Sequence, residues 1–214
     1  QILNLIKSDI MNTFSNVEIF YIFKNNYRMI LLLFQINILS PEKSIYNLFA
    51  KNEKCLKYFF YFYPEFKESI DQEYPKFYKN WISDKKNYEI NRQIGENESY
   101  ISFLIRTDSV EEFITYVNKT NISLSKTKIT QSLYETNPFL LKKEPTLIEY
   151  AAFYGSISIF QYLRLQKVNL TPSLWLYVIH SNNAEMVHLL EENHVVPEDD
   201  TYKECYKEAI KCHH

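Results

Sequence analysis

The sequence predicts an all-α protein, built as a solenoid of helical hairpins that an N-terminal helical region caps. Apolar residues recur at a spacing near 3.6 along most of the chain, which is the period of an α-helix. Only two glycines occur, Gly95 and Gly155, and few segments alternate between apolar and polar residues as strands do. A helix-turn-helix pattern also recurs at a fixed offset, which is typical of stacked repeats.

The clearest copy of the repeated unit runs from Pro145 to Leu163. Its first helix contains Ala151 and Ala152, whose small side chains allow neighbouring helices to approach closely. Gly155 follows, and glycine can adopt the positive φ that a tight link between two helices needs. The second helix then presents an apolar stripe. This pattern predicts one helical hairpin.

The same unit recurs from Pro172 to Leu190, an offset of 27 (172 minus 145). Proline, leucine, tyrosine and leucine are identical at its first, third, sixth and last positions. Asn182 replaces Gly155, and asparagine tolerates the left-handed region better than other non-glycine residues. Trp175 aligns with Ile148, so we expect it in the core. The recurrence predicts two hairpins stacked in register.

Two further copies are less complete. A third begins near Cys205, with Ala209 and Ile210 lying 31 positions after Val178 and Ile179, and we expect it to be truncated. Upstream, the stretch 101–117 aligns as an earlier copy, in which Phe113, Ile114 and Val117 lie 46 positions before Ile159, Phe160 and Leu163.

The order of residues from 146 to 155 resembles the ankyrin repeat, T-P-L-H-x-A-A-x-x-G followed by an apolar helix. Leu147 stands where that family has proline, and Glu149 where it has histidine. With the tracts 62–65 and 132–143, the chain looks like the expanded ankyrin-repeat proteins of trichomonad-type protists, which carry an uncharacterised helical N-terminal region. This resemblance implies an intracellular protein without catalytic residues, whose repeats continue beyond residue 214.

We expect an N-terminal helical region at 1–98 and ankyrin-like repeats at 99–214, with the polar stretch 83–98 as the boundary. The N-terminal region should contain helices at 2–11, 14–24 and 27–39, followed by one that starts at Pro41. The apolar run 29–34 is too short to span a membrane and predicts a buried helix. The insertion before Pro145 should hold one more helix at 128–134.

Lysines interleaved with aromatic residues between 51 and 81 could offer stacking platforms to single-stranded nucleic acid. Acidic residues offset those lysines, and the formal net charge is −2, so the electrostatic footprint of a nucleic-acid binder is missing. Consecutive aromatics on a helix also cannot all face one groove. We therefore expect this segment to contribute to a core and to a solvated face, and we expect neither nucleic-acid binding nor membrane insertion.

The sequence contains no phosphate-binding loop, nucleophile elbow or zinc-protease helix. Cysteine and histidine gather at one place, where Cys205, Cys212, His213 and His214 would suit zinc. No second ligand pair follows at the spacing of a zinc module, so we expect structural cysteines, no metal and no cofactor. The odd cysteine count and the lack of a secretory signal favour a reducing compartment, the cytoplasm.

The favoured function is a noncatalytic protein–protein interaction scaffold that binds a protein partner through the concave face of the repeats. In the repeat pattern the two residues after the Ala-Ala pair project toward that face. These residues are Phe153 and Tyr154, and the equivalent residues of the next repeat are His180 and Ser181. The alternative is that Phe153 and Tyr154 pack beneath the insertion before Pro145. Two other functions remain open: an enzyme with dispersed site residues, and an RNA-binding helical repeat.

Overall fold

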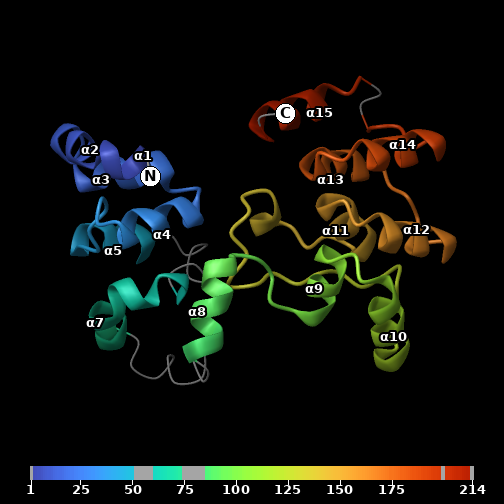
Figure 1. Ribbon diagram of the computed structural model, residues 1–214, viewed down its shortest axis with the longest axis horizontal. Helices are drawn as coiled ribbons and strands as arrows, with labels where there is room; N and C mark the ends of the chain where they lie inside the picture. The colour runs from blue at the N-terminus through green and yellow to red at the C-terminus, as the bar shows by residue number, and fades with distance from the viewer. Residues whose placement is uncertain (1, 51–59, 74–84, 199–200, 213–214) are drawn as a thin grey trace. The chain divides into compact units, whose positions relative to one another are not determined.

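The computed structural model describes residues 2–50, 60–73, 85–198 and 201–212, and these form an all-helical protein held together by helix–helix packing (Figure 1). The described residues contain no strand, only an isolated bridge between Lys128 and Thr146. None of the described helices has the length and apolar character needed to cross a bilayer. The all-α prediction is confirmed.

The chain divides into two compact units. Unit 1 comprises residues 1–97 and 132–142, and unit 2 comprises residues 98–131 and 143–214. The polar stretch 83–98, expected as a boundary, contains a helix in its described part. Residues 132–142, which the sequence groups with the repeats, belong to unit 1.

Unit 1 contains the helices of the N-terminal region. They are α1 (Ile2–Leu5), α2 (Lys7–Thr13), α3 (Asn16–Phe23), α4 (Tyr27–Gln35), α5 (Lys43–Ala50), α7 (Tyr63–Glu73) and α8 (Lys85–Ile94). Helix α3 begins with a capping box, in which the Ser15 hydroxyl accepts from Glu18 N–H and the Glu18 carboxylate accepts from Ser15 N–H. Helix α5 begins at Lys43, so the prediction that Pro41 occupies its first position was wrong.

Aromatic rings form much of the core of unit 1. Phe62 packs against Phe34 and Phe49, with ring centroids 5.8 Å and 5.0 Å apart, and Phe66 packs 5.7 Å from Phe34. The four consecutive aromatics at 60–63 are all buried, because a turn at Phe62 interrupts the helix and lets every ring face the core. Within the described residues, the expectation of an aromatic core is confirmed; residues 51–59 and 74–84 lie outside them.

Residues 128–134 form no helix, so the prediction of a helix there was wrong, and the insertion before α11 instead holds a short 3-10 helix, η3 (Leu140–Lys142). The Ile129 N–H donates to the Pro145 carbonyl over 2.7 Å, and the bridge at Lys128 joins the same two stretches. Backbone groups that bond to a distant stretch are not free for the local bonds of a helix. Further on, the Thr136 hydroxyl donates to the Gly95 carbonyl over 2.7 Å, which ties 132–142 to the end of α8.

Unit 2 is a series of packed helices. They are α9 (Tyr100–Arg106), α10 (Val110–Thr120), α11 (Leu147–Tyr154), α12 (Ile157–Leu165), α13 (Leu174–Ser181), α14 (Ala184–Glu192) and α15 (Lys203–Cys212). Helix α11 packs against α9, α12 and α13, while α13 packs against α14 and α15 and α10 against α12 (Figure 1). Trp175 is buried as expected, and its indole N–H donates to the Val195 carbonyl over 2.7 Å.

The 27-residue offset is visible in the backbone. Gly155 and Asn182 end α11 and α13 with φ of 68° and 48°, and Lys167 and His194 take φ of 62° and 55° after α12 and α14. In the earlier copy, Asn121 after α10 has φ of 53°. Asn121 precedes Lys167 by 46 positions, the same separation as between Phe113 and Ile159, and it follows a helix longer than α12.

Candidate functional site

The four residues predicted to bind a partner lie at the C-terminal ends of α11 and α13, two helices that pack side by side. Phe153 is buried, with 7% of its surface exposed, whereas Tyr154, His180 and Ser181 are half-buried. The rings of Phe153 and His180 stack, with centroids 5.0 Å apart and planes inclined by 28°. The structure thus brings the two pairs together; partner binding at this place stays a prediction.

A cluster of three different functional groups adjoins these residues. His180 Nε2 lies 3.0 Å from Glu208 Oε1, and the Cys212 sulfur lies 3.4 Å from His180 Nδ1 and 3.7 Å from its Nε2. Glu208 and Cys212 are four residues apart on α15, so they share the helix face that meets α13. We call these three residues the His180 cluster.

The surroundings of the cluster shift the pKa values of Glu208 and Cys212 in opposite directions. Burial opposes ionisation of Glu208, but hydrogen bonds from Lys211 and His180 outweigh it and lower the pKa of this carboxyl. Burial raises the pKa of the Cys212 thiol, and the nearby carboxylate of Glu208 adds to the effect. A nucleophilic cysteine needs the opposite shift, toward thiolate at neutral pH.

The position of the Cys212 sulfur relative to the His180 ring also differs from that of an activated thiol. Its distances to the two ring nitrogens differ by little, so the thiol lies over the imidazole face and not along a nitrogen lone pair. A cysteine–histidine nucleophile requires a hydrogen bond in the ring plane. The His180 cluster therefore lacks the arrangement of an activated thiol, although it resembles a triad in composition.

The sequence-based candidates for a metal are distributed differently. Cys205 is buried, while His213 and His214 lie outside the described residues. Sequence reasoning missed the pairing of Cys212 with His180. The sequence did contain a hint of this pairing. Cys212 lies 31 positions after Ser181, the offset that also aligns Ala209 with Val178, so the alignment places Cys212 on α15 at the position equivalent to Ser181 on α13.

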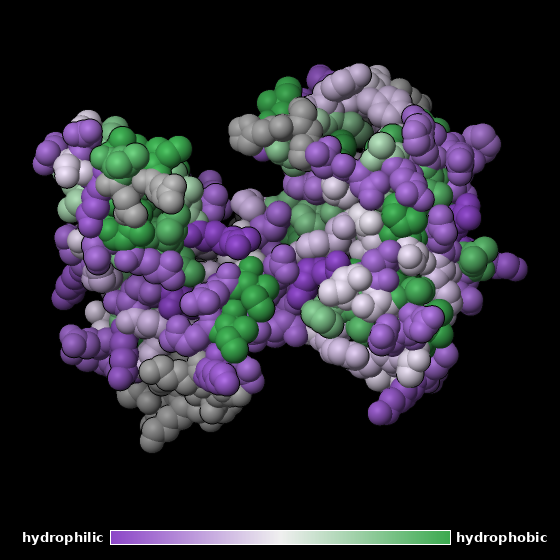
Figure 2. Space-filling view, viewed as in Figure 1, coloured by the Kyte–Doolittle hydropathy of each residue, from purple (hydrophilic) through white to green (hydrophobic). Residues whose placement is uncertain are grey.

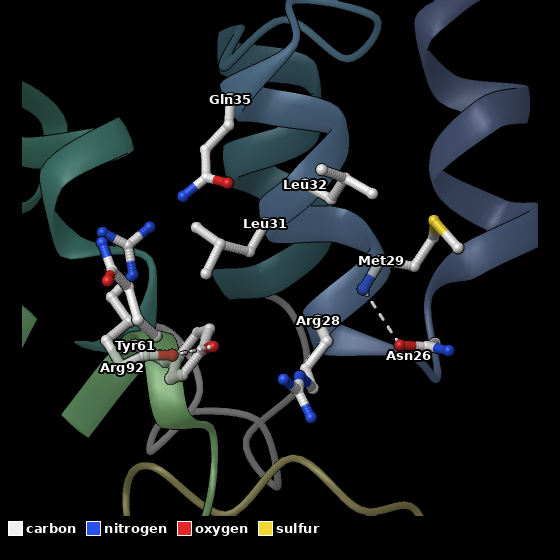
Figure 3. Close-up of a pocket in the computed structure, with 9 residues that line it drawn as sticks. Asn26, Arg28, Met29, Leu31, Leu32, Gln35, Tyr61 and Arg92 are labelled. Carbon is white, nitrogen blue, oxygen red and sulfur yellow. Dashed lines mark hydrogen bonds between the residues drawn. The ribbon is translucent and has the colours of Figure 1, made fainter. Parts of the chain in front are cut away.

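Unit 1 contains a pocket of about 490 Å³ between α4 and α8 (Figure 3). Arg28, Arg92 and Tyr61 line it together with Asn26, Met29, Leu31, Leu32, Gln35 and Gln93. Arg92 forms an ion pair with Glu65, and the Tyr61 hydroxyl donates to the Arg92 carbonyl over 2.8 Å. Burial raises the pKa of Tyr61 to about 12. Two guanidinium groups could receive a small anion, but Arg92 and Tyr61 already hold α8 against the segment at 60–65.

Apolar side chains are also exposed on the first helices of unit 1, and Figure 2 shows hydrophobic residues gathered there. Ile2, Leu5 and Ile22 expose 75%, 83% and 59% of their surface. On the same view, the hydrophobic residues of unit 2 are scattered among hydrophilic ones.

No family model matches the chain, and neither curated proteins nor solved structures gave a match.

Proposed function

We propose that the chain is a noncatalytic scaffold in the cytoplasm, and that unit 2 is a short ankyrin-like array that binds a protein partner. The observation that carries the proposal is the order of packing: α9, α11, α13 and α15 contact one another in chain order. Repeats that stack in this way build a continuous surface from equivalent positions, and such surfaces are typical of binding solenoids.

The departure from the ankyrin pattern at Glu149 is compatible with the proposal. Its carboxylate accepts from the Thr146 N–H over 2.8 Å and from the Thr146 hydroxyl over 2.9 Å, which completes a capping box at the start of α11. The same carboxylate accepts from the Ser173 hydroxyl, at the start of the next hairpin, over 2.7 Å. Glu149 therefore both caps its own helix and links consecutive repeats.

The proposed contact surface lies at the C-terminal turns of the first helices. Each successive first helix contributes one residue to this surface: Arg106 from α9, Tyr154 from α11 and Ser181 from α13. His180 adjoins them. The Arg106 guanidinium lies over the Tyr154 ring, 5.9 Å from its centroid. Tyrosine and arginine are enriched among the residues that dominate binding energy. Phe153 lies beneath this surface and would support Tyr154, whose ring centroid is 4.9 Å away.

The proposal is tested by isolating the partner on the wild-type chain and titrating it against variants. Replacing Tyr154, His180 and Ser181 together by alanine should weaken binding by about 2 kcal/mol or more, roughly 30-fold. Phe153 is left in place because its burial would add a loss of stability. The matched control is Leu165→Ala on α12, a side chain that is 72% exposed.

Urea unfolding of each variant separates binding from folding. A triple variant that stays folded and binds as tightly as the wild type would reject this surface. Equal losses in the triple variant and the Leu165 control would show that the partner does not distinguish the two faces.

A further inference from the structure

The His180 cluster combines three side chains that bind the same class of metal ion. Imidazole nitrogen, thiolate sulfur and carboxylate oxygen are the three protein donors found in zinc sites. Two helices supply them, α13 and α15, which are consecutive first helices of unit 2. Any ion bound here would connect the last described helix to the preceding repeat.

The spacing of the donor atoms suits one small cation. In a tetrahedral zinc site, bonds of about 2.0–2.3 Å place neighbouring donor atoms roughly 3.3–3.7 Å apart. His180 Nε2 lies 3.0 Å from Glu208 Oε1 and 3.7 Å from the Cys212 sulfur, and the donor atoms of the three residues all lie within 4.8 Å of one another. An ion bound to Nε2 in the ring plane would require the Cys212 sulfur, which lies over the ring face, to move toward that plane.

Neighbouring groups already orient two of the donors. The Phe153 ring stacks on His180 and so restrains the imidazole plane. Lys211 Nζ donates to Glu208 Oε2 over 2.7 Å, which leaves Oε1 turned toward His180. Contacts of this kind, which fix the direction of a ligand, are a regular feature of metal sites.

We propose that His180, Glu208 and Cys212 form a zinc-binding site that fastens α15 to α13. One thiolate and one carboxylate balance the charge of a divalent cation, with the imidazole neutral. Thiolate and imidazole favour zinc over magnesium and calcium, which select oxygen donors. Three protein ligands leave the fourth position of a tetrahedral ion to water or to a donor from a bound partner. The site does not depend on the function proposed above.

Cobalt(II) is the probe for the experiment, because a cobalt–thiolate bond produces an ultraviolet charge-transfer band that reports the sulfur directly. The full chain is first treated with chelator and reducing agent, and then titrated with cobalt alone and with zinc in competition. We expect one equivalent to bind with a thiolate band, which zinc abolishes. We also expect zinc to raise the melting temperature, since an ion that binds only the folded state stabilises it.

Single substitutions assign the ligands. Cys212→Ser should remove the thiolate band, and His180→Asn and Glu208→Gln should each weaken zinc binding by at least about 100-fold, more than the loss of an orienting group usually causes. His188→Ala is the matched control, because His188 also pairs with a glutamate, Glu191, over 3.1 Å, on an exposed face of α14. Replacing both His213 and His214 by alanine controls for binding by the adjacent histidines.

The outcomes separate the site from its alternatives. Retention of the band in both control variants, with its loss in Cys212→Ser and weakened zinc binding in His180→Asn, supports the proposal. A band that disappears when His213 and His214 are replaced but persists in His180→Asn would place the ion elsewhere and overturn it. The absence of any thiolate band in the folded wild-type chain would also overturn it, and circular dichroism verifies folding for every variant.

Discussion

The hairpins α11–α12 and α13–α14 have the same spacing but start their helices in different ways. A capping box of Thr146 and Glu149 starts α11, whereas the Ser173 hydroxyl makes no capping bond to α13 and donates to Glu149 instead. In the second helices the difference is reversed. Asn183 caps α14 with its own side chain, while Ser156 makes no side-chain cap for α12.

The missing cap of α12 is supplied by Asp108, a residue of the preceding helical hairpin in unit 2. The Asp108 carboxylate accepts from the N–H groups of Ser158 and Ile159, each over 2.9 Å, and so satisfies the free donors at the start of this helix. A carboxylate at this end of a helix also interacts favourably with the helix dipole. The comparison shows that the apolar positions and the left-handed turns repeat, whereas the polar bonds that start each helix do not.

The largest effect should come from the repeated apolar positions. Leu163 and Leu190 are equivalent, 27 residues apart, and both are fully buried. Replacing either by alanine should lower the free energy of unfolding by about 2–5 kcal/mol through lost burial and a residual cavity. Urea denaturation measures this loss, with Leu165→Ala as the exposed control at less than about 0.5 kcal/mol. If one of the buried leucines behaved like the control, the two hairpins would not share a core position.

A smaller effect is expected at the left-handed turns. Gly155→Ala should cost about 1–2 kcal/mol, because a Cβ is strained at positive φ and would lie 3.2 Å from Asn183 Nδ2. Asn182→Gly, at the equivalent turn, should change stability by no more than a few tenths of a kcal/mol, since both residues tolerate this conformation. Thermal unfolding of the two variants distinguishes these values, and an equal change at both turns would contradict the equivalence of Gly155 and Asn182.

The smallest effect should distinguish the two capping arrangements. Asp108→Gly removes the carboxylate but suits the positive φ of this residue, 49°, and should cost about 1 kcal/mol. Asp108→Asn keeps an acceptor and should cost less. Asn183→Ala should cost a similar amount by removing the internal cap of α14. Hydrogen exchange at the first turns of α12 and α14 checks the assignment. Asp108→Gly should speed amide exchange at the first turn of α12 alone, and unchanged exchange there would refute capping of α12 by Asp108.

Residues that are close in sequence carried the predictions that succeeded. The helical class follows from local periodicity, and the burial of Trp175 and the positive φ at Gly155 and Asn182 follow from the 27-residue spacing and the preferences of single residues. The helix expected at 128–134 failed because Ile129 bonds to Pro145, a partner that local pattern cannot reveal. The candidate site was predicted in part: Phe153 and His180 do lie together, but Glu208 and Cys212 were not connected with them.

By itself, the sequence determined the helical character of this protein, the 27-residue spacing and the buried apolar positions that recur with it, such as Leu163 and Leu190, because these depend on side-chain type at short range. The tertiary structure alone decided that 132–142 joins unit 1, that Asp108 caps α12, and that His180 meets Glu208 and Cys212. Each of these depends on groups that are roughly 30 to 50 residues apart along the chain, and only packing of the intervening helices brings such groups within hydrogen-bonding distance.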